Sequence, residues 1–298
     1  MSNDFVCPQC RGPLQAATPE TCYCPVDQLS FARLDGIWRF LPPARANQFA
    51  PFIADYEAIR AAEGRGAESA DYYRQLPAVD LTGRHSAMWA QRHESFQLLL
   101  RHLPESPRQI LDLGAGNGWL SNQLTRRGHH LTAVDLSLSQ LDGLGAHHHY
   151  EQPFLSIQAE FDHLPLPDAS LDIIIANAAF HYSTSYSETL SALKPLLRPS
   201  GQLIILDTPF YRDPRAGQQM AAARHAHFAQ TYGRASDSLP LEDFLTEARL
   251  MALAAAGGWA YQLHWSQGRW RRLAQYWRGR LRHGRETAQF PLVIMQPC

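Results

Sequence analysis

An apolar run that ends in an acidic residue and a glycine-rich loop constrains this chain more than any other feature. Residues 110–118 read Ile-Leu-Asp-Leu-Gly-Ala-Gly-Asn-Gly. The apolar residues predict a buried parallel strand, and the glycines permit a tight turn where a ligand approaches the backbone before a helix begins near Trp119. A second apolar run, residues 131–134, ends in Asp135, where a carboxylate can accept hydrogen bonds from both hydroxyls of a ribose. The pattern therefore predicts an α/β fold that binds a nucleoside.

Two classes of nucleoside ligand compete for this loop. The Gly-x-Gly-x-x-Gly fingerprint of dinucleotide-binding proteins needs a small residue at the position that Trp119 occupies. The carboxylate of Asp112 is unfavourable beside a pyrophosphate, but it suits the ammonium and sulfonium groups of S-adenosylmethionine, which carries no phosphate. These residues predict S-adenosylmethionine as the cofactor.

The segments that follow extend the pattern. An acidic segment that ends in Leu-Pro, residues 160–165, comes before another buried strand at 172–177. With these motifs, residues 108–208 resemble the class I S-adenosylmethionine-dependent methyltransferases, in particular the methyltransferase type 11 group. The resemblance implies a Rossmann-like α/β fold with a mostly parallel seven-stranded sheet, completed by a terminal strand at residues 290–295.

The resemblance also implies a set of cofactor-binding residues. Glu160 takes the position whose carboxylate usually contacts the adenine amino group, and Phe161 flanks the ring. Because the family more often has Asp at this position, the contact is either longer or made by Asp162. The expected cofactor-binding residues are Asp112, Gly114, Ala115, Gly116, Asn117, Asp135, Leu136, Glu160, Phe161 and Asn177.

Candidate catalytic residues follow the strand at residues 172–177, where class I enzymes bring donor and acceptor together. His181 is a candidate general base, since its ordinary pKa near 6.5 suits proton removal at neutral pH. The alternative is a histidine that only makes a hydrogen bond at the end of a strand. Tyr182 lies beside it and either takes part in the chemistry or only shapes the pocket.

Four of the five cysteines lie within the first 24 residues, a density that predicts a metal site rather than disulfides. The segment 24–37 resembles the short zinc ribbon that precedes many bacterial methyltransferase domains, where the expected final cysteine falls on Asp27. The ligands would then be Cys7, Cys10 and Cys24 with either Cys22 or Asp27, or the ribbon has lost its metal.

The motifs divide the chain into three segments. Residues 1–42 are the expected zinc-ribbon-like module, 43–106 a helical linker or lid, and 107–298 the S-adenosylmethionine-binding domain. The middle segment contains Tyr56, Arg60, Trp89 and Arg92, which either line a lid over the cofactor or are ordinary packing residues.

Charge and hydropathy limit the partners. With 27 Lys and Arg against 28 Asp and Glu, the chain has no overall attraction to nucleic acid. No run approaches 18 apolar residues and residues 2–4 do not resemble a signal peptide, so we expect a cytoplasmic protein without a membrane partner. Oligomeric state is not predicted. Aromatic side chains interleave a group of arginines, which form either an RNA surface or a solvated amphipathic helix: Arg269, Arg271, Arg272, Arg278, Arg280, Arg282 and Arg285.

These patterns together predict an enzyme that transfers a methyl group from S-adenosylmethionine to an unidentified acceptor. A small metabolite or a lipid-like molecule is the favoured acceptor. The alternatives are an enzyme similar to the ribosomal RNA guanine methyltransferases, with RNA as the partner, and a non-catalytic protein that binds S-adenosylmethionine and acts on a partner.

Overall fold

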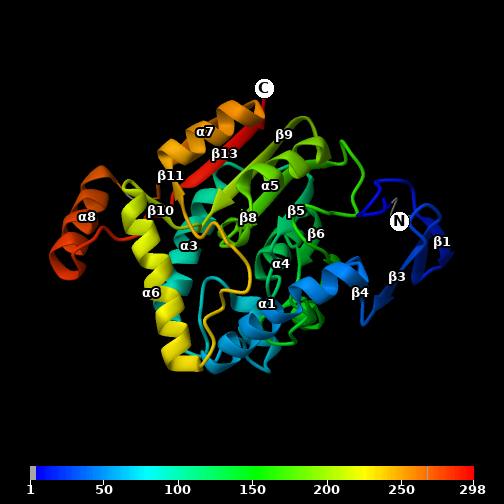
Figure 1. Cartoon of the computed structure of the whole chain (residues 1–298), viewed down its shortest axis with the longest axis horizontal. Helices are drawn as coiled ribbons and strands as arrows, with labels where there is room; N and C mark the ends of the chain where they lie inside the picture. The colour runs from blue at the N-terminus through cyan, green and yellow to red at the C-terminus, as the bar shows by residue number, and fades with distance from the viewer. Residues whose placement is uncertain (1–4, 267) are drawn as a thin grey trace.

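The structure is a computed structural model that describes residues 5–266 and 268–298. Within these residues an eleven-stranded mixed sheet runs through the molecule in the order β1-β2-β3-β4-β7-β6-β5-β8-β9-β13-β12 (Figure 1). Its strands are β1 (Gln15–Thr18), β2 (Thr21–Cys24), β3 (Leu29–Leu34), β4 (Ile37–Arg39), β5 (Gln109–Leu113), β6 (His130–Asp135), β7 (Leu155–Gln158), β8 (Leu171–Asn177), β9 (Leu197–Leu206), β12 (Trp259–His264) and β13 (Leu292–Pro297). A separate parallel pair joins β10 (Phe210–Tyr211) and β11 (Leu245–Thr246).

The seven strands from β7 to β12 form the predicted Rossmann-like sheet. Strands β7, β6, β5, β8 and β9 pair in parallel, and β13 lies antiparallel between β9 and β12. The order reverses between β6-β5 and β8, so the carboxyl ends of β5 and β8 flank the crevice where α/β proteins bind ligands. The predicted fold class is therefore confirmed. The terminal strand occupies residues 292–297 rather than the expected 290–295.

The N-terminal strands are joined to this sheet, which the sequence did not indicate. Strands β1 to β4 pair antiparallel in succession, and β4 then pairs in parallel with β7 through Ile37 and Ser156. The ring of Phe5 packs edge to face against Trp38 and Phe40, and the rings of Trp38 and Phe40 stack, all within the main hydrophobic core. The division of the chain at residue 42 stays a prediction, since one sheet continues across it.

Helices cover both faces of the sheet (Figure 1). Successive residues of a strand point to opposite faces, so Ile173 and Ile175 pack against α3 and α4 while Ile174 and Ala176 pack against α5 and α7. The helices are α1 (Pro43–Ala62), α2 (Ala70–Gln75), α3 (Ser86–Leu100), α4 (Trp119–Thr125), α5 (Tyr186–Leu193), α6 (Pro214–Tyr232), α7 (Glu247–Gly257) and α8 (Arg269–His283), with short 3₁₀ turns η1 (Leu144–His149), η2 (Phe180–Tyr182) and η3 (Lys194–Leu196).

Local signals in the sequence explain where several helices begin and end. The side chain of Asp213 accepts a hydrogen bond from the backbone of Arg215 at the start of α6, and the helix stops at Gly233 in a left-handed conformation. Thr246 and Gly258 do the same for α7. Figure 1 shows α8 and the N-terminal strands at opposite ends of the molecule. Among the helices of the described residues, none is long and apolar enough to cross a membrane.

Candidate functional site

The glycine-rich loop connects β5 to α4 at the crevice. Gly114, Gly116 and Gly118 all have positive φ values, of 73°, 54° and 78°. A Cβ atom on Gly114 would lie 2.4 Å from the Cβ of Ala179, so this position has no room for a side chain. The backbone of Gly114 also donates a hydrogen bond of 2.8 Å to the carbonyl of Val134 in β6. The loop is therefore held tightly against the ends of β6 and β8.

A cavity of about 960 Å³, counting space open to solvent, lies over this loop. Every predicted cofactor-binding residue except Glu160 lines it, and so does Tyr182. The structure thus brings most of the predicted residues to one site, where their contacts with a cofactor stay a prediction. Aromatic side chains and charged side chains both line this cavity, and sites for small ligands combine apolar surface with polar groups in this way.

Asp135 lies at the end of β6, and the backbone holds its carboxylate in place. Its two oxygens accept hydrogen bonds of 2.8 Å from the backbone nitrogens of Gly116 and Ser137. Burial raises the pKa of Asp135 to about 6, although these two hydrogen bonds act in the opposite direction. The free lone pairs of this carboxylate are suited to the two hydroxyls of a ribose.

Asp112 lies in β5 and is buried below the loop. Its Oδ2 accepts a hydrogen bond of 2.8 Å from the hydroxyl of Ser121 in α4. Burial raises the pKa of Asp112 to about 7, and the nearby charge of Asp135 adds to the effect. Two buried carboxylates with raised pKa values favour a cationic ligand, because a positive charge would stabilise their ionised forms.

Glu160 is engaged by a residue that the sequence reading did not consider. Both of its carboxylate oxygens are bound by the guanidinium of Arg45 in α1, and Nε of Arg45 donates to Oε1 at 2.8 Å. Glu160 lines a smaller adjoining cavity together with Asp162, while Phe161 lines both cavities. The contact of Glu160 with adenine therefore stays a prediction, and Arg45 would have to share that carboxylate.

His181 lies close to the main cavity without lining it. It is buried in η2, and its Nδ1 has no hydrogen-bond partner among the described residues. Burial, with smaller contributions from Arg224, Arg60 and Arg92, lowers the pKa of His181 to about 3. The side chain is therefore neutral at neutral pH and a weak base. Its catalytic role stays a prediction, and the geometry does not favour it.

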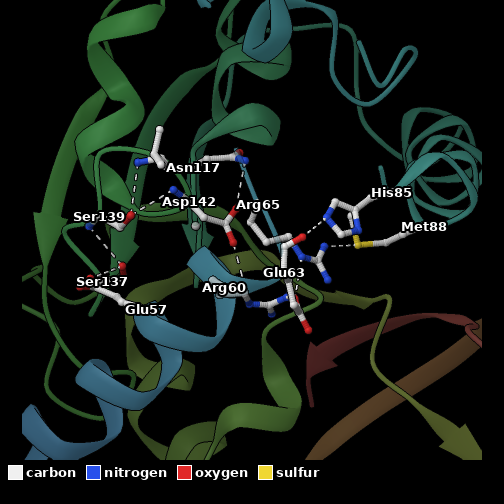
Figure 2. Close-up of polar contacts among 12 residues, drawn as sticks. Glu57, Arg60, Glu63, Arg65, His85, Met88, Asn117, Ser137, Ser139 and Asp142 are labelled. Atoms are coloured by element: carbon white, nitrogen blue, oxygen red, sulfur yellow. Dashed lines mark hydrogen bonds and ion pairs between the residues drawn. The ribbon is translucent and has the colours of Figure 1, made fainter. Parts of the chain in front are cut away.

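The middle segment of the chain, which is called the lid below, lines one side of the cavity, and its closure over a cofactor stays a prediction. Figure 2 shows polar contacts of this segment. The hydroxyl of Ser137 donates to Oε1 of Glu57 in α1 at 2.6 Å, and Nε of Arg60 lies 3.8 Å from Oδ2 of Asp142. Asp142 also accepts a hydrogen bond of 3.4 Å from Asn117 of the glycine loop. These contacts tie α1 to the loop that follows β6.

The sequence left open whether four side chains of this segment belong to a lid or only pack, and all four line the cavity: Tyr56, Arg60, Trp89 and Arg92. The sequence reading missed Arg65 and Asp142, which line it as well. Neither belongs to a motif, and Asp142 comes near the arginines only through the fold. The turn at Gly64, with a φ of 69°, is the one local signal that a chain reversal precedes Arg65.

The arginines of the lid differ in how their charges are compensated. Arg60 pairs with Asp142 and Glu63, and Arg65 pairs with Glu63 at 2.9 Å. The guanidinium of Arg92 lies 4.9 Å from the ring centre of Trp89, but it makes no hydrogen bond or ion pair with another described residue. Burial lowers the pKa of Arg92, which remains a cation at neutral pH.

A second group of functional side chains lies near the N-terminus. The ligand atoms of Cys7, Cys10, Cys24 and Asp27 all lie within 4.8 Å of one another. The predicted ligand Cys22 is not in this group; it is buried in β2, where its neighbours across the sheet are Ala16 and Phe31. Three thiols and one carboxylate in a compact group suit a zinc ion, which takes four sulfur, nitrogen or oxygen ligands.

The arginines of α8 leave the predicted RNA surface untested. The side chains of Arg269, Arg271, Arg272, Arg278 and Arg282 lie outside the described residues. Arg280 is described, and its guanidinium lies 5.6 Å from the ring centre of Tyr276.

Residues 111–205 match the family described as methyltransferase domain. Over 153 residues the chain is 31% identical to the malonyl-[acyl-carrier protein] O-methyltransferase of Pseudescherichia vulneris, covering 50% of this chain and 53% of that protein. Over 199 residues it is 28% identical to the Yersinia pestis protein of the same name, covering 66% and 65%. The chain thus spans less than two thirds of the length of these relatives.

A solved structure resembles the chain over most of its length. The 1,6-didemethyltoxoflavin-N1-methyltransferase of Burkholderia thailandensis superimposes with a TM-score of 0.51 at 16% identity, covering 96% of this chain and 99% of that one. At this identity the likeness concerns the fold. With the matched family, the strand order and the glycine loop, the chain contains a class I methyltransferase domain, a class whose cofactor is S-adenosylmethionine.

Proposed function

We propose that this protein transfers the methyl group of S-adenosylmethionine to a carboxylate oxygen of a small or lipid-like acid. The observation that carries the acceptor part of the proposal is Arg92, a cation in the wall of the cavity that makes no hydrogen bond or ion pair with another described residue. The two relatives named malonyl-[acyl-carrier protein] O-methyltransferase support an acid as the acceptor.

The donor fits the wall formed by the glycine loop and the ends of β5 and β6. Asp135 would accept hydrogen bonds from the ribose, and the glycine loop leaves room for the ligand against its backbone. The buried carboxylates of Asp112 and Asp135 would offset the positive charges of the ammonium and sulfonium groups.

Arg92 supports an anionic acceptor for an energetic reason. A half-buried cation that makes no ion pair gains free energy when an anionic ligand binds beside it. Asp207, at the end of β9, exerts the largest charge effect on the pKa of Arg92, but it already accepts a hydrogen bond from Ser95 and burial raises its own pKa.

A carboxylate acceptor also needs the least help from the protein. S-adenosylmethionine supplies a methyl group on a cationic sulfur. The acceptor oxygen would form a bond to the methyl carbon as the carbon–sulfur bond breaks, and the sulfur would keep the electron pair and leave in S-adenosylhomocysteine. A carboxylate is already deprotonated at neutral pH, so no base is required. The tasks left to the chain are to hold the acceptor through Arg92, to align it, and to exclude water with the lid helices α1 and α3.

The test is a labelling experiment with a defined acceptor. The protein is incubated with S-adenosylmethionine that carries a tritiated methyl group, with malonyl-coenzyme A as the probe, and in parallel with fractionated cell extract. A methyl ester releases volatile methanol in alkali, so base-labile label on the probe or on acids of the extract supports the proposal. Base-stable label in RNA would instead support the RNA alternative. Donor binding without any labelled product would support a non-catalytic protein.

A further inference from the structure

Two turns of the N-terminal segment have the same local structure. The first reads Cys7-Pro8-Gln9-Cys10-Arg11 and the second reads Cys24-Pro25-Val26-Asp27-Gln28. In both turns the residue after the fourth position has a positive φ, 62° for Arg11 and 55° for Gln28. Neither is a glycine, so the same strained conformation recurs in two turns that are related by sequence. Asp27 thus occupies in the second turn the place that Cys10 occupies in the first.

The two turns face each other with their polar atoms close together. The Sγ of Cys7 lies 3.1 Å and that of Cys24 lies 3.4 Å from Oδ2 of Asp27, and the sulfurs of Cys10 and Cys24 are 3.6 Å apart. Backbone nitrogens of Gln9 and Asp27 donate to the sulfurs of Cys7 and Cys24 at 3.4 and 3.3 Å. Such donors stabilise thiolates, the form of cysteine that binds metals.

The first turn also holds a loop of the methyltransferase domain. Nη1 of Arg11 donates to the carbonyl of Leu164 at 2.7 Å, and Nη2 donates to the carbonyl of Leu166 at 2.9 Å and to Asp168 at 2.7 Å. One residue N-terminal to Cys7, the backbone nitrogen of Val6 donates to the carbonyl of Pro165 at 3.2 Å. The loop held in this way, residues 160–168, begins with Glu160 and Phe161.

We propose that Cys7, Cys10, Cys24 and Asp27 bind one zinc ion, and that this ion fixes the turn from which Arg11 positions the loop of residues 160–168 beside the donor cavity. Cys22 and Cys298 take no part. Phe161 lines the cavity, so a change in the loop reaches the donor directly. The coupling to the donor rests on the proposed function, whereas the metal site does not. Arg11 is a positioning residue in this scheme, because it acts through the loop.

The metal site is tested by spectroscopy on the full chain. Purified protein should contain about one zinc per chain, and its cobalt-substituted form should show the intense thiolate-to-metal absorption of a tetrahedral site. Asp27→Ala should weaken zinc binding at least about tenfold in competition with a chromophoric chelator. Asp27→Cys should restore it, and Cys22→Ser should leave it unchanged. Metal-free protein that folds normally, or equal loss of zinc in Cys22→Ser, would overturn the ligand set.

The coupling is tested by calorimetry with S-adenosylhomocysteine. Removal of zinc and the substitution Arg11→Met should each raise its Kd by about fivefold or more. Removal of zinc from the Arg11→Met variant should raise the Kd little further than either change alone, because both changes release the same loop. The matched control is Arg33→Met, which removes an exposed arginine of β3 that pairs with Glu20.

Hydrogen exchange gives a second readout that does not depend on donor binding. Loss of zinc or of the Arg11 side chain should speed exchange in residues 160–168 while leaving β8 protected. An unchanged Kd and unchanged exchange in Arg11→Met would refute the coupling. If no variant or wild-type protein bound S-adenosylhomocysteine, the proposed function would fail, and the cobalt spectrum and the exchange data would still decide the zinc site and the role of Arg11.

Discussion

The two walls of the cavity are built in different ways. The sheet wall, formed by Asp112, residues 114–117, Asp135 and Leu136, comes from two adjacent strands and the loop between β5 and α4. The lid wall, formed mainly by Tyr56, Arg60, Arg65, Trp89 and Arg92, comes from α1, α3 and the segment between them. Backbone geometry fixes the first wall, whereas long side chains on packed helices form the second.

This difference separates two kinds of recognition. In the sheet wall, positive φ values and backbone hydrogen bonds to Asp135 leave little freedom, which suits a donor of constant shape. In the lid wall, some charged side chains form ion pairs, such as Arg60 with Asp142. Arg92 makes no ion pair with another described residue. Side chains of this kind can change without disturbing the sheet, which suits an acceptor that differs between related enzymes.

The largest expected effect concerns the lid wall. Arg92→Gln should lower kcat/KM for a carboxylate acceptor by about 30-fold to 1,000-fold, because truncating one partner of a buried charge pair costs about 2 to 4 kcal/mol. Donor affinity should change less than about threefold by calorimetry, since the proposal assigns Arg92 to the acceptor. Arg101→Gln, an exposed arginine just past α3, is the matched control. A large loss of S-adenosylmethionine affinity in Arg92→Gln would show that Arg92 binds the donor. The two walls would then not bind different ligands.

The next effect concerns the sheet wall. Asp135→Ala should weaken binding of S-adenosylmethionine by about 1.5 to 3 kcal/mol, or about 10-fold to 150-fold, because charge-assisted hydrogen bonds to the ribose are lost. Calorimetry measures the loss directly, and the melting temperature of the variant shows whether the loop still folds. Tight binding of NAD, or an unchanged affinity for S-adenosylmethionine, would contradict the assignment of this wall to the donor.

A smaller effect should appear in the pH dependence of donor binding. Burial raises the pKa of Asp112 to about 7 and that of Asp135 to about 6 in the free cavity. A cationic donor favours their ionised forms, so binding below these values must release protons. Affinity should therefore rise about threefold to tenfold between about pH 6 and pH 8 and then level off. Asp112→Asn should flatten the curve; a flat wild-type curve would indicate that no proton is released.

The same shifts affect the stability of the empty protein with the opposite sign. Unfolded carboxylates titrate near about pH 4. The folded protein binds more protons than the unfolded chain between that value and about pH 7, so the free energy of unfolding should fall as pH rises through this window. Urea titrations at several pH values, with and without donor, would separate the two effects.

The sequence predicted the sheet wall well because that wall depends on local chemistry. A glycine loop after an apolar strand and an acidic residue at the next strand end determine their own backbone, and they locate the cavity without knowledge of the rest of the fold. The Arg45 pair of Glu160 could not be predicted, since it joins residues 115 positions apart by side chains alone. The pairing of β4 with β7 could not be predicted either, because the sequence of a short strand does not indicate which distant strand it pairs with.

The metal site shows the limit of counting residues. The resemblance to a zinc ribbon left Cys22 and Asp27 as alternatives for the fourth ligand. The fold groups Asp27 with Cys7, Cys10 and Cys24, because the second turn repeats the backbone of the first. A comparison of the two turns as five-residue units, rather than a count of cysteines, would have found the repeat.

The smallest expected effect concerns His181, which does not line the cavity. A general base at this position would lower turnover by about 100-fold to 10,000-fold on substitution with Asn, and the acidic limb of the pH profile would disappear. Its pKa of about 3, lowered first by burial, leaves it unprotonated and weakly basic above about pH 5, and its side chain does not line the cavity. A carboxylate acceptor has no proton to give up. His181→Asn should therefore change kcat less than about threefold, with an unaltered profile from about pH 5 to pH 9. A hundredfold loss with intact donor affinity would instead show that the acceptor is protonated before transfer, and that the lid wall selects it by something other than charge.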